Sequence, residues 1–166
     1  MLRSVKPVVA VCATFLAVVN VKIAPLAEWD QAMIDAYYIQ PGQRFVAAAL
    51  KEQAEPLPEL TDDLYLRYTR DGNRTDFQQA NLRRMGRLNL LAWAEGVEHR
   101  GRFIPAMATL LEAILAEKTW VLPAHDPKLN NFEGRWTEVD LMVAMKGWSL
   151  ATIAYWHADQ LPPELL

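Results

Sequence analysis

The amino-acid sequence predicts an all-α protein built from antiparallel helix pairs. Three observations lead to this fold class. Apolar residues recur at helical spacing over three long segments in the second half of the chain. A short turn containing Gly101 joins the first two segments, which is the pattern of an αα-hairpin. No alternation of period two, which would indicate strands, is found after residue 75.

Length and composition indicate one globular domain of ordinary size. The chain has 166 residues, of which 52% are hydrophobic and 22% are charged. Its net charge of -3, with no basic tail and no RNA-binding or zinc spacing, argues against a nucleic-acid partner. Metal-binding, phosphate-binding and serine-hydrolase motifs are also absent from the sequence, so no metal and no cofactor is expected.

Residues 1–27 have the pattern of a secretory signal peptide. Arg3 and Lys6 precede an uncharged, mostly apolar run over residues 7–19, which is too short to span a bilayer as a helix. The cleavage site is poor, whether the cut follows Ala24 or Ala27. A buried N-terminal helix and a short membrane anchor are the alternative interpretations.

Removal of residues 1–27 would change both the charge and the redox chemistry of the protein. Three cations and no acid leave with this segment, so the net charge goes from -3 to -6. Cys12, the single cysteine, leaves as well, and a chain without cysteine tolerates an oxidising compartment. We therefore expect a periplasmic or secreted protein, without membrane contact after cleavage, whose domain covers residues 28–166.

Two short helices are predicted at the start of this domain. Apolar residues at helical spacing predict the first helix over residues 28–38. Pro41-Gly42 is a break signal, and an Ala-rich stretch after it predicts a second helix over residues 45–53.

The region from residue 56 to residue 74 is ambiguous. Pro56-Leu57-Pro58 favours extended backbone. Residues 64–68 fit a strand as well as a helical turn, and Asp71-Gly72-Asn73 is a turn signal.

Three longer helices are predicted after residue 74. The first follows a capping box formed by Thr75 and Gln78 and extends to about Glu98. The second covers residues 103–118, after a turn at residues 100–102. The third begins after a capping pair of Thr137 with Asp140, continues to about Asp159, and is ended by Pro162-Pro163.

The segment between the second and third of these helices is the candidate site. It is longer than a simple connection needs, and its three large aromatic side chains argue against disorder. His125, beside Asp126, is a candidate for contact with a substrate, or alternatively pins the loop through its backbone. Asn130 and Asn131 are candidates for hydrogen bonds to hydroxyl or carboxylate groups, or alternatively turn residues.

Aromatic and basic residues offer further candidates. Trp120 and Trp136, in or beside the loop, are better placed to stack on sugar rings than Trp148 and Trp156, whose helical spacing predicts core positions. Five arginines form a local cluster that would bind an anionic ligand, or pair with Glu95 and Glu98 on a solvated face; these are Arg83, Arg84, Arg87, Arg100 and Arg102.

Several segments of the second half resemble one known family. They are Asn81 to Arg87, Glu117 to Asp126 with its Trp-Val-Leu-Pro-Ala-His run, Asn131-Phe132, Val139-Asp140-Leu141 and Asp159-Gln160-Leu161. Together they resemble the N-terminal helical region of heparinase II/III-like polysaccharide lyases. The resemblance covers about residues 75–166, whereas residues 28–74 match only loosely.

The resemblance implies a fold and an activity. The fold would be part of an incomplete (α/α) toroid, whose exposed edge could support self-association. The activity would be β-elimination on an acidic, uronate-containing polysaccharide, without a cofactor. That reaction needs a group that neutralises the carboxylate, a base, and an acid for the leaving oxygen.

The catalytic segments of the family's members lie in later helices and a sheet domain, so the resemblance implies an N-terminal fragment whose catalytic residues are unknown. Asn130-Asn131-Phe132 superficially resembles the family's Asn-bearing catalytic segment, but it precedes the wrong helix and does not take over that role. The expected substrate-binding residues are Trp120, His125, Asn131, Arg135 and Trp136. The alternative function is a non-catalytic module that binds glycan or packs its helices against a partner.

Overall fold

The computed structural model describes residues 40–166, and their regular structure is entirely helical. Within this range there is no strand, which confirms the all-α prediction. The five α-helices are α3 (Gln40–Glu52), α4 (Asp62–Asp71), α5 (Thr75–Glu98), α6 (Ile104–Leu115) and α7 (Leu141–Trp156). Two short 3-10 helices are η3 (Pro123–His125) and η4 (Pro163–Leu165). None of the described helices is both long and apolar enough to cross a membrane.

The predicted signal peptide at residues 1–27 and the predicted helix at residues 28–38 lie outside the described residues.

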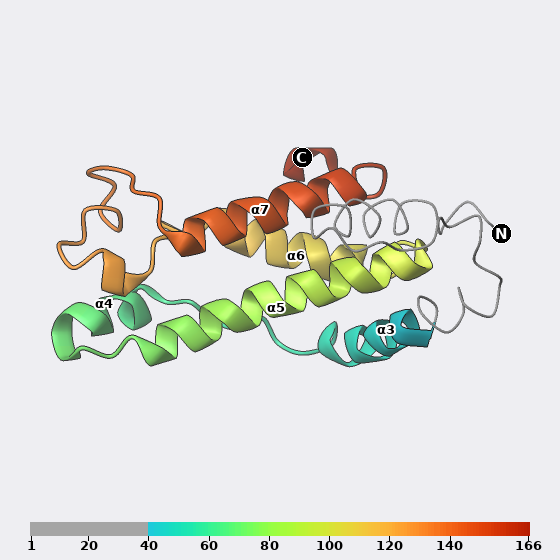
Figure 1. Ribbon diagram of the computed structural model, residues 1–166, viewed down its shortest axis with the longest axis horizontal. Helices are drawn as coiled ribbons and strands as arrows, with labels where there is room; N and C mark the ends of the chain where they lie inside the picture. Colours follow the sequence, from blue (N-terminus) through green and yellow to red (C-terminus); the bar gives the residue numbers. More distant parts are fainter. Residues whose placement is uncertain (1–39) are drawn as a thin grey trace, which may run out of the picture.

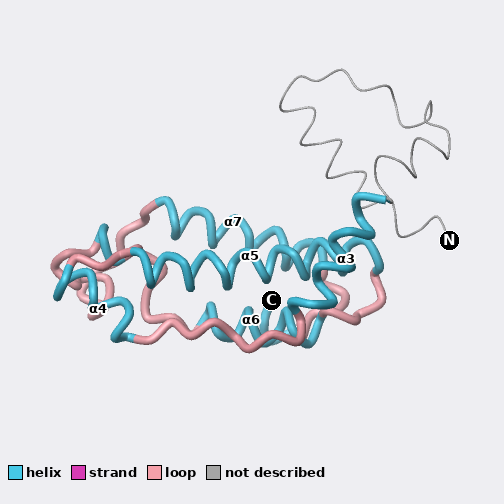
Figure 2. Tube along the Cα trace, turned by 90° about the horizontal axis from the view of Figure 1, so that it is seen from below, coloured by secondary structure: helices cyan, strands magenta, loops and turns pink. Residues whose placement is uncertain are grey.

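Helix α5 runs the length of the described molecule and organises the other helices around it (Figure 1). Helix α6 returns antiparallel to it after a short turn, and α7 then runs in the same direction as α5. Figure 2 shows α5 and α7 side by side, with α6 in a second layer. Helix α4 and the long loop before α7 gather at one end, whereas α3 packs along the C-terminal half of α5.

The core lies between α5 and α6 and extends to α7 and the C-terminal segment. Burial of such apolar side chains is the main favourable term in folding. Because the apolar side chains of α5 and α6 pack against each other, they fix how the two helices lie together. The loop that follows α6 therefore starts from a fixed position. The central buried side chains are Leu88, Leu91, Phe103, Met107, Ile114, Ile153 and Leu161.

Helix α3 begins at Gln40, earlier than residue 45, so the predicted break at Pro41-Gly42 is wrong. Pro41 falls in the first turn, where the missing amide costs no intrahelical hydrogen bond. Gly42 lies where a Cβ would be 3.1 Å from a methyl carbon of Val97 on α5, so a residue without a side chain lets the two helices approach.

The ambiguous residues 64–68 belong to helix α4, which Thr61 caps by accepting the Leu64 amide. Gly72 ends the helix with φ of 75°, which confirms the predicted turn. Tyr65 is buried in this helix and stacks on Phe132 of the long loop, with ring centres 4.8 Å apart. In the helix, Tyr65 makes this contact with a segment far along the chain. The contact stabilises the helix, whereas the local sequence left a strand equally open.

Both predicted capping pairs are wrong, although the helices begin near the expected positions. At α5 it is Asn73 whose Oδ1 accepts the Asp76 amide at 3.2 Å, while Gln78 instead accepts a hydrogen bond from Arg74. At α7 the cap is Asp140 itself, which accepts the Val143 amide at 2.9 Å. Helix α7 therefore begins at Leu141, the residue after this cap.

The predicted core position of Trp148 is wrong, because its side chain is 77% exposed on α7. Trp156 is half-buried and meets Trp93 of α5 edge to face, with ring centres 4.9 Å apart. The helix also ends at Trp156, short of the predicted Asp159.

Candidate functional site

The carboxylate of Asp126 holds the long loop in one conformation. It is buried and accepts hydrogen bonds from the Phe132 amide at 2.9 Å, from the Asn131 amide at 3.2 Å and from the Tyr65 hydroxyl at 3.2 Å. The Asn131 side-chain amide is a further donor, at 3.3 Å. Burial, together with the charge of Asp126, raises the pKa of Tyr65, so this hydroxyl stays protonated and donates.

Asn131 is buried and uses both ends of its side chain within the loop. Its Oδ1 accepts the Glu138 amide at 2.7 Å, and its Nδ2 donates to Asp126 and to Glu138. The residue therefore joins the start of the loop to the segment before α7. Its effect on any ligand would be exerted through the shape of the loop.

Trp120 lies at the junction between the loop and the core. Its indole Nε1 donates to the Ile114 carbonyl at 2.9 Å, near the end of α6, and its ring packs partly buried against the core. Tryptophan commonly combines such packing with one hydrogen bond when it is buried. Trp120 therefore fixes how the chain leaves α6.

His125 is a half-exposed ionisable group at the start of the loop, and Asp140 orients its ring. Its side chain is 49% exposed, and its Nδ1 lies 2.8 Å from Oδ2 of Asp140. Within residues 40–166 the ring makes no other hydrogen bond, so no partner for Nε2 is found there. An imidazole oriented through one nitrogen can accept a proton, or donate one, at the other.

Asp140 performs three tasks with one carboxylate. It caps α7, accepts the Leu122 amide at 2.9 Å, and orients His125. Burial alone would raise the pKa of Asp140, but the hydrogen bonds from the Leu122 and Val143 amides and from His125 outweigh it, so its pKa is lowered. The carboxylate of Asp140 therefore ionises more readily than an ordinary aspartate.

Arg135 and Trp136 occupy the outer turn of the loop. Arg135 donates to Oδ1 of Asn130 at 2.8 Å and to the Lys128 carbonyl at 2.6 Å, and it pairs with Glu133. Its guanidinium therefore braces the turn while remaining half exposed. Trp136 is 55% exposed and offers a free ring surface beside it.

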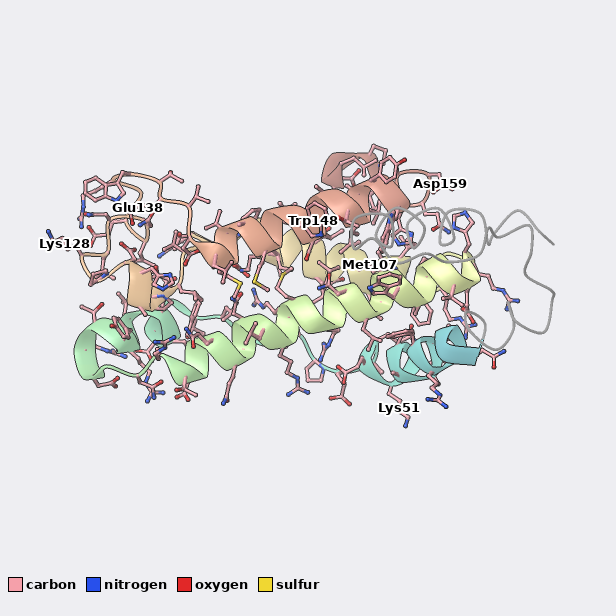
Figure 3. All side chains as sticks on the ribbon, viewed as in Figure 1. Lys51, Met107, Lys128, Glu138, Trp148 and Asp159 are labelled. Atoms are coloured by element: carbon pink, nitrogen blue, oxygen red, sulfur yellow. The ribbon has the colours of Figure 1, made fainter. Side chains whose placement is uncertain are left out.

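The five predicted site residues thus separate into two groups. His125, Arg135 and Trp136 face solvent on one loop, at the end of the molecule where Figure 3 marks Lys128 and Glu138. Trp120 and Asn131 hold that loop from within. Sequence reasoning missed Tyr65, which lies 61 positions before its partner Asp126 and carries no local signal of this contact.

Two members of the predicted arginine cluster, Arg84 and Arg87 on α5, are buried and paired within the protein, so their charges do not face an external anion. Arg84 donates to the Pro58 carbonyl at 2.6 Å and meets Glu117 at 3.3 Å. Arg87 meets Glu52 at 3.2 Å. Glu117 and Glu52 come from distant segments and were not among the partners expected from the sequence. The expected pairing with Glu98 is made by Arg102, at 2.6 Å.

Comparisons with known proteins do not assign the loop to any site. The chain matches no family model and no curated protein. Within the described range, no three His, Cys, Asp or Glu side chains gather as metal ligands. The chemistry of the loop therefore rests on His125, Arg135 and Trp136 as their geometry presents them.

Replacing Asp126 with alanine is expected to lower the free energy of unfolding by about 3 kcal/mol, because several donors lose a buried charged acceptor. Urea denaturation measures this loss, and hydrogen exchange should show the amides of Asn131 and Phe132 losing protection first. Asp159→Ala is the matched control, since Asp159 is an exposed carboxylate paired with His99, and its loss should cost less than about 1 kcal/mol. Equal stability of the two variants would contradict the assignment.

Proposed function

We propose that this chain is the N-terminal helical part of a polysaccharide lyase resembling the heparinase II/III-like proteins, and that its long loop contacts a uronate-containing glycan. The observation that carries this proposal is the oriented His125: Asp140 holds its Nδ1, and the half-exposed ring makes no other hydrogen bond within residues 40–166. An Asp-oriented imidazole suits a sugar carboxylate in either protonation state: the cation pairs with the carboxylate, and the neutral ring exchanges a proton.

Two other exposed side chains of the same loop support the same ligand chemistry. Trp136 provides an exposed ring on which a sugar can stack, and the half-exposed guanidinium of Arg135 adds positive charge. Trp120 and Asn131 act as positioning residues, because they fix the loop that carries the other three. In this proposal the loop binds the glycan, and the loop residues alone are not sufficient for turnover.

The toroid belongs to the same proposal. An (α/α) toroid is built from successive helix hairpins, and α5 with α6 is one such hairpin, closed by a short turn. Helix α7 then begins the next hairpin in the same direction as α5. The outward face of α7 would be the open edge of an incomplete toroid.

Replacing His125 with alanine is expected to weaken binding to a uronate-containing oligosaccharide about tenfold, because one charge-assisted hydrogen bond contributes about 1.5 kcal/mol. Titration calorimetry measures the affinity, and a neutral oligosaccharide of the same length should bind weakly to both proteins. His99→Ala is the matched control: His99 is a half-exposed histidine paired with Asp159 at 3.3 Å at the C-terminal end of α5.

Three results would overturn the proposal in distinct ways. No binding to acidic glycan would remove the ligand class, and equal affinities for the two histidine variants would remove the role of His125. A rise in absorbance near 235 nm, which reports unsaturated uronate, would show that this chain alone turns over substrate. The proposed role of the chain would then be catalysis and not only glycan binding.

A second function is a helical interaction module without glycan chemistry. One observation favours it: α7 exposes a continuous apolar face, and large exposed apolar patches mark interaction surfaces. Binding of the chain to a protein partner, with no response to acidic glycan, is the result that would favour this function over the first.

A further inference from the structure

Asn81 of α5 is a buried residue whose polar side chain has no partner among residues 40–166. The residue is 1% exposed, and neither Oδ1 nor Nδ2 of its side chain makes a hydrogen bond within that range. A buried amide without a hydrogen bond costs free energy, so folded proteins nearly always pair such a group with protein or with ordered water. The partner of Asn81 therefore has to be sought among the groups that it faces.

Helix geometry directs Asn81 toward Lys146 of α7. At the end of α7, Nε2 of His157 lies 3.1 Å from the carbonyl oxygen of Ala92 on α5. Asn81 lies 11 residues before Ala92, and Lys146 lies 11 residues before the histidine. Eleven residues make about three turns, so each earlier residue lies on the same side of its helix as the later one. Because α5 and α7 run side by side in the same direction (Figure 2), the two earlier residues are opposite each other.

A shared carboxylate marks the same level of the two helices. Glu117, which follows α6, pairs with the Lys146 ammonium and lies 3.3 Å from the guanidinium of Arg84 on α5. None of these three side chains is more than 8% exposed. Arg84 follows Asn81 by three residues, and residues with this spacing are neighbours on a helix surface. Asn81 therefore borders a buried ionic group.

The ionic group has hydrogen-bonding capacity that its members do not use on one another. An ammonium has three N–H donors, and within residues 40–166 the Lys146 ammonium meets a single acceptor, Glu117. The two oxygens of Glu117 accept from different cations, and a carboxylate oxygen can accept from a second donor. Donors on Lys146, an acceptor on Asn81 and acceptors on Glu117 thus lie in one buried region.

We infer that this region is a binding site for one buried water molecule, which bridges Asn81 on α5 and Lys146 on α7. The water oxygen accepts a hydrogen bond from the Lys146 ammonium, and the two water hydrogens are donated to Oδ1 of Asn81 and to the Glu117 carboxylate. A buried water typically makes about three hydrogen bonds, to groups that otherwise have no partner. A small anion fits this place less well, because the charges of Glu117 and Asp140 already act on Lys146.

The sign of a stability change tests the inference. Replacing Asn81 with leucine, an apolar residue of the same branched shape, is expected to raise the unfolding equilibrium constant about tenfold, because the ammonium and the water lose a partner. Without a bound water the replacement only removes an unpaired amide, so the constant would fall. Asn89→Leu is the matched control: Asn89 is a partly exposed asparagine of α5, and its replacement should change the constant less than about twofold. Urea denaturation measures all three proteins, and an unchanged or lowered constant for Asn81→Leu overturns the inference.

A double-mutant cycle separates the bridge from any change in packing that leucine causes. In a chain that already carries Lys146→Met, Asn81→Leu should raise the unfolding equilibrium constant at least about threefold less than it does in the wild type, because the bridge has already lost one end. Asn89→Leu should have the same effect in both backgrounds. Equal effects of Asn81→Leu in the two backgrounds would mean that Asn81 and Lys146 are not joined, and would overturn the inference.

A crystal structure of the full chain, at a resolution that shows ordered water, tests the site directly. The electron density should contain one isolated peak within hydrogen-bond distance of Oδ1 of Asn81 and of Nζ of Lys146. A protein side chain in that place, including one from residues 1–39, would overturn the inference, as would a direct hydrogen bond between Asn81 and Lys146. This measurement needs no variant, so it remains decisive even if Lys146→Met fails to fold.

This inference goes beyond the proposed function and does not depend on it. The water site lies between α5 and α7, whereas the glycan contact lies on the loop that precedes α7. His125→Ala should therefore leave the coupling between Asn81 and Lys146 unchanged. Failure of glycan binding would leave the water site in place, and an empty water site would leave the glycan proposal in place.

Discussion

Replacing Glu117 with glutamine is expected to lower the free energy of unfolding by about 3–5 kcal/mol, the usual cost of breaking a buried ion pair. The carboxylate of Glu117 meets two buried cations, Arg84 on α5 and Lys146 on α7. Burial lowers the pKa of Lys146, and the charge of Glu117 opposes that effect. Without this carboxylate, both cations would remain buried without their counter-charge.

Urea denaturation of matched variants measures this effect. Glu112→Gln is the control, because Glu112 is an exposed glutamate on α6 and its replacement should change stability by less than about 0.5 kcal/mol. Adding Lys146→Met to Glu117→Gln should recover much of the loss, since the unpaired ammonium is then gone. A loss below about 1 kcal/mol for Glu117→Gln would show that water or a rearrangement satisfies the two cations.

Replacing Glu95 with alanine is expected to cost about 4 kcal/mol, because buried donors lose a charged acceptor. Glu95 is fully buried on α5 and accepts the Gly101 amide at 2.6 Å, the Phe103 amide at 3.0 Å and the side-chain amide of Gln160 at 3.1 Å. It thus closes the turn between α5 and α6 and ties the C-terminal segment to it. Glu95→Gln keeps one acceptor oxygen, so its cost should be about half as large.

The contribution of Glu95 also depends on pH with a definite sign. Burial by itself would raise the pKa of Glu95, but the amides of Phe103 and Gly101 and the side chain of Gln160 outweigh it, so the pKa lies below the ordinary 4.5. A carboxyl whose pKa is lower in the folded state stabilises the fold above the unfolded pKa. That stability is lost as the pH falls from 4.5 through the folded value.

The difference in unfolding free energy between wild type and Glu95→Gln should therefore be constant above about pH 6 and shrink toward pH 3. Urea titrations at several pH values measure it. A difference that grows as the pH falls would mean that burial, and not hydrogen bonding, controls the ionisation of Glu95.

Local sequence patterns were sufficient for α5 and α6. Their apolar residues recur on one side of each helix, and Gly101, with φ of 75°, interrupts the chain between them. These signals lie within a few residues of the structure they specify. The caps were less predictable, because Asn73 and Asp140 compete for the helix ends with neighbours of similar chemistry, and only the backbone geometry distinguishes them.

The candidate loop was recognisable from its length and its aromatic residues, but its internal organisation was not. Asp126 gains its role from Tyr65, and Asp140 orients His125 across 15 positions. The separation of exposed His125 from buried Asn131 follows from these contacts. The spacing of residues in the sequence does not indicate which distant residue each loop side chain contacts.

Neighbouring residues are enough to specify that residues 40–166 are helical, where the α5–α6 hairpin turns, and which loop is polar and aromatic. Only the tertiary structure decided which side of α7 is buried. Apart from Lys146 that helix is apolar on both its inner and outer sides, so its periodicity does not distinguish Ile153 in the core from Trp148 at the surface. The same holds for Arg84, whose counter-charge is 33 positions away and reaches it only when α5 and α6 pack.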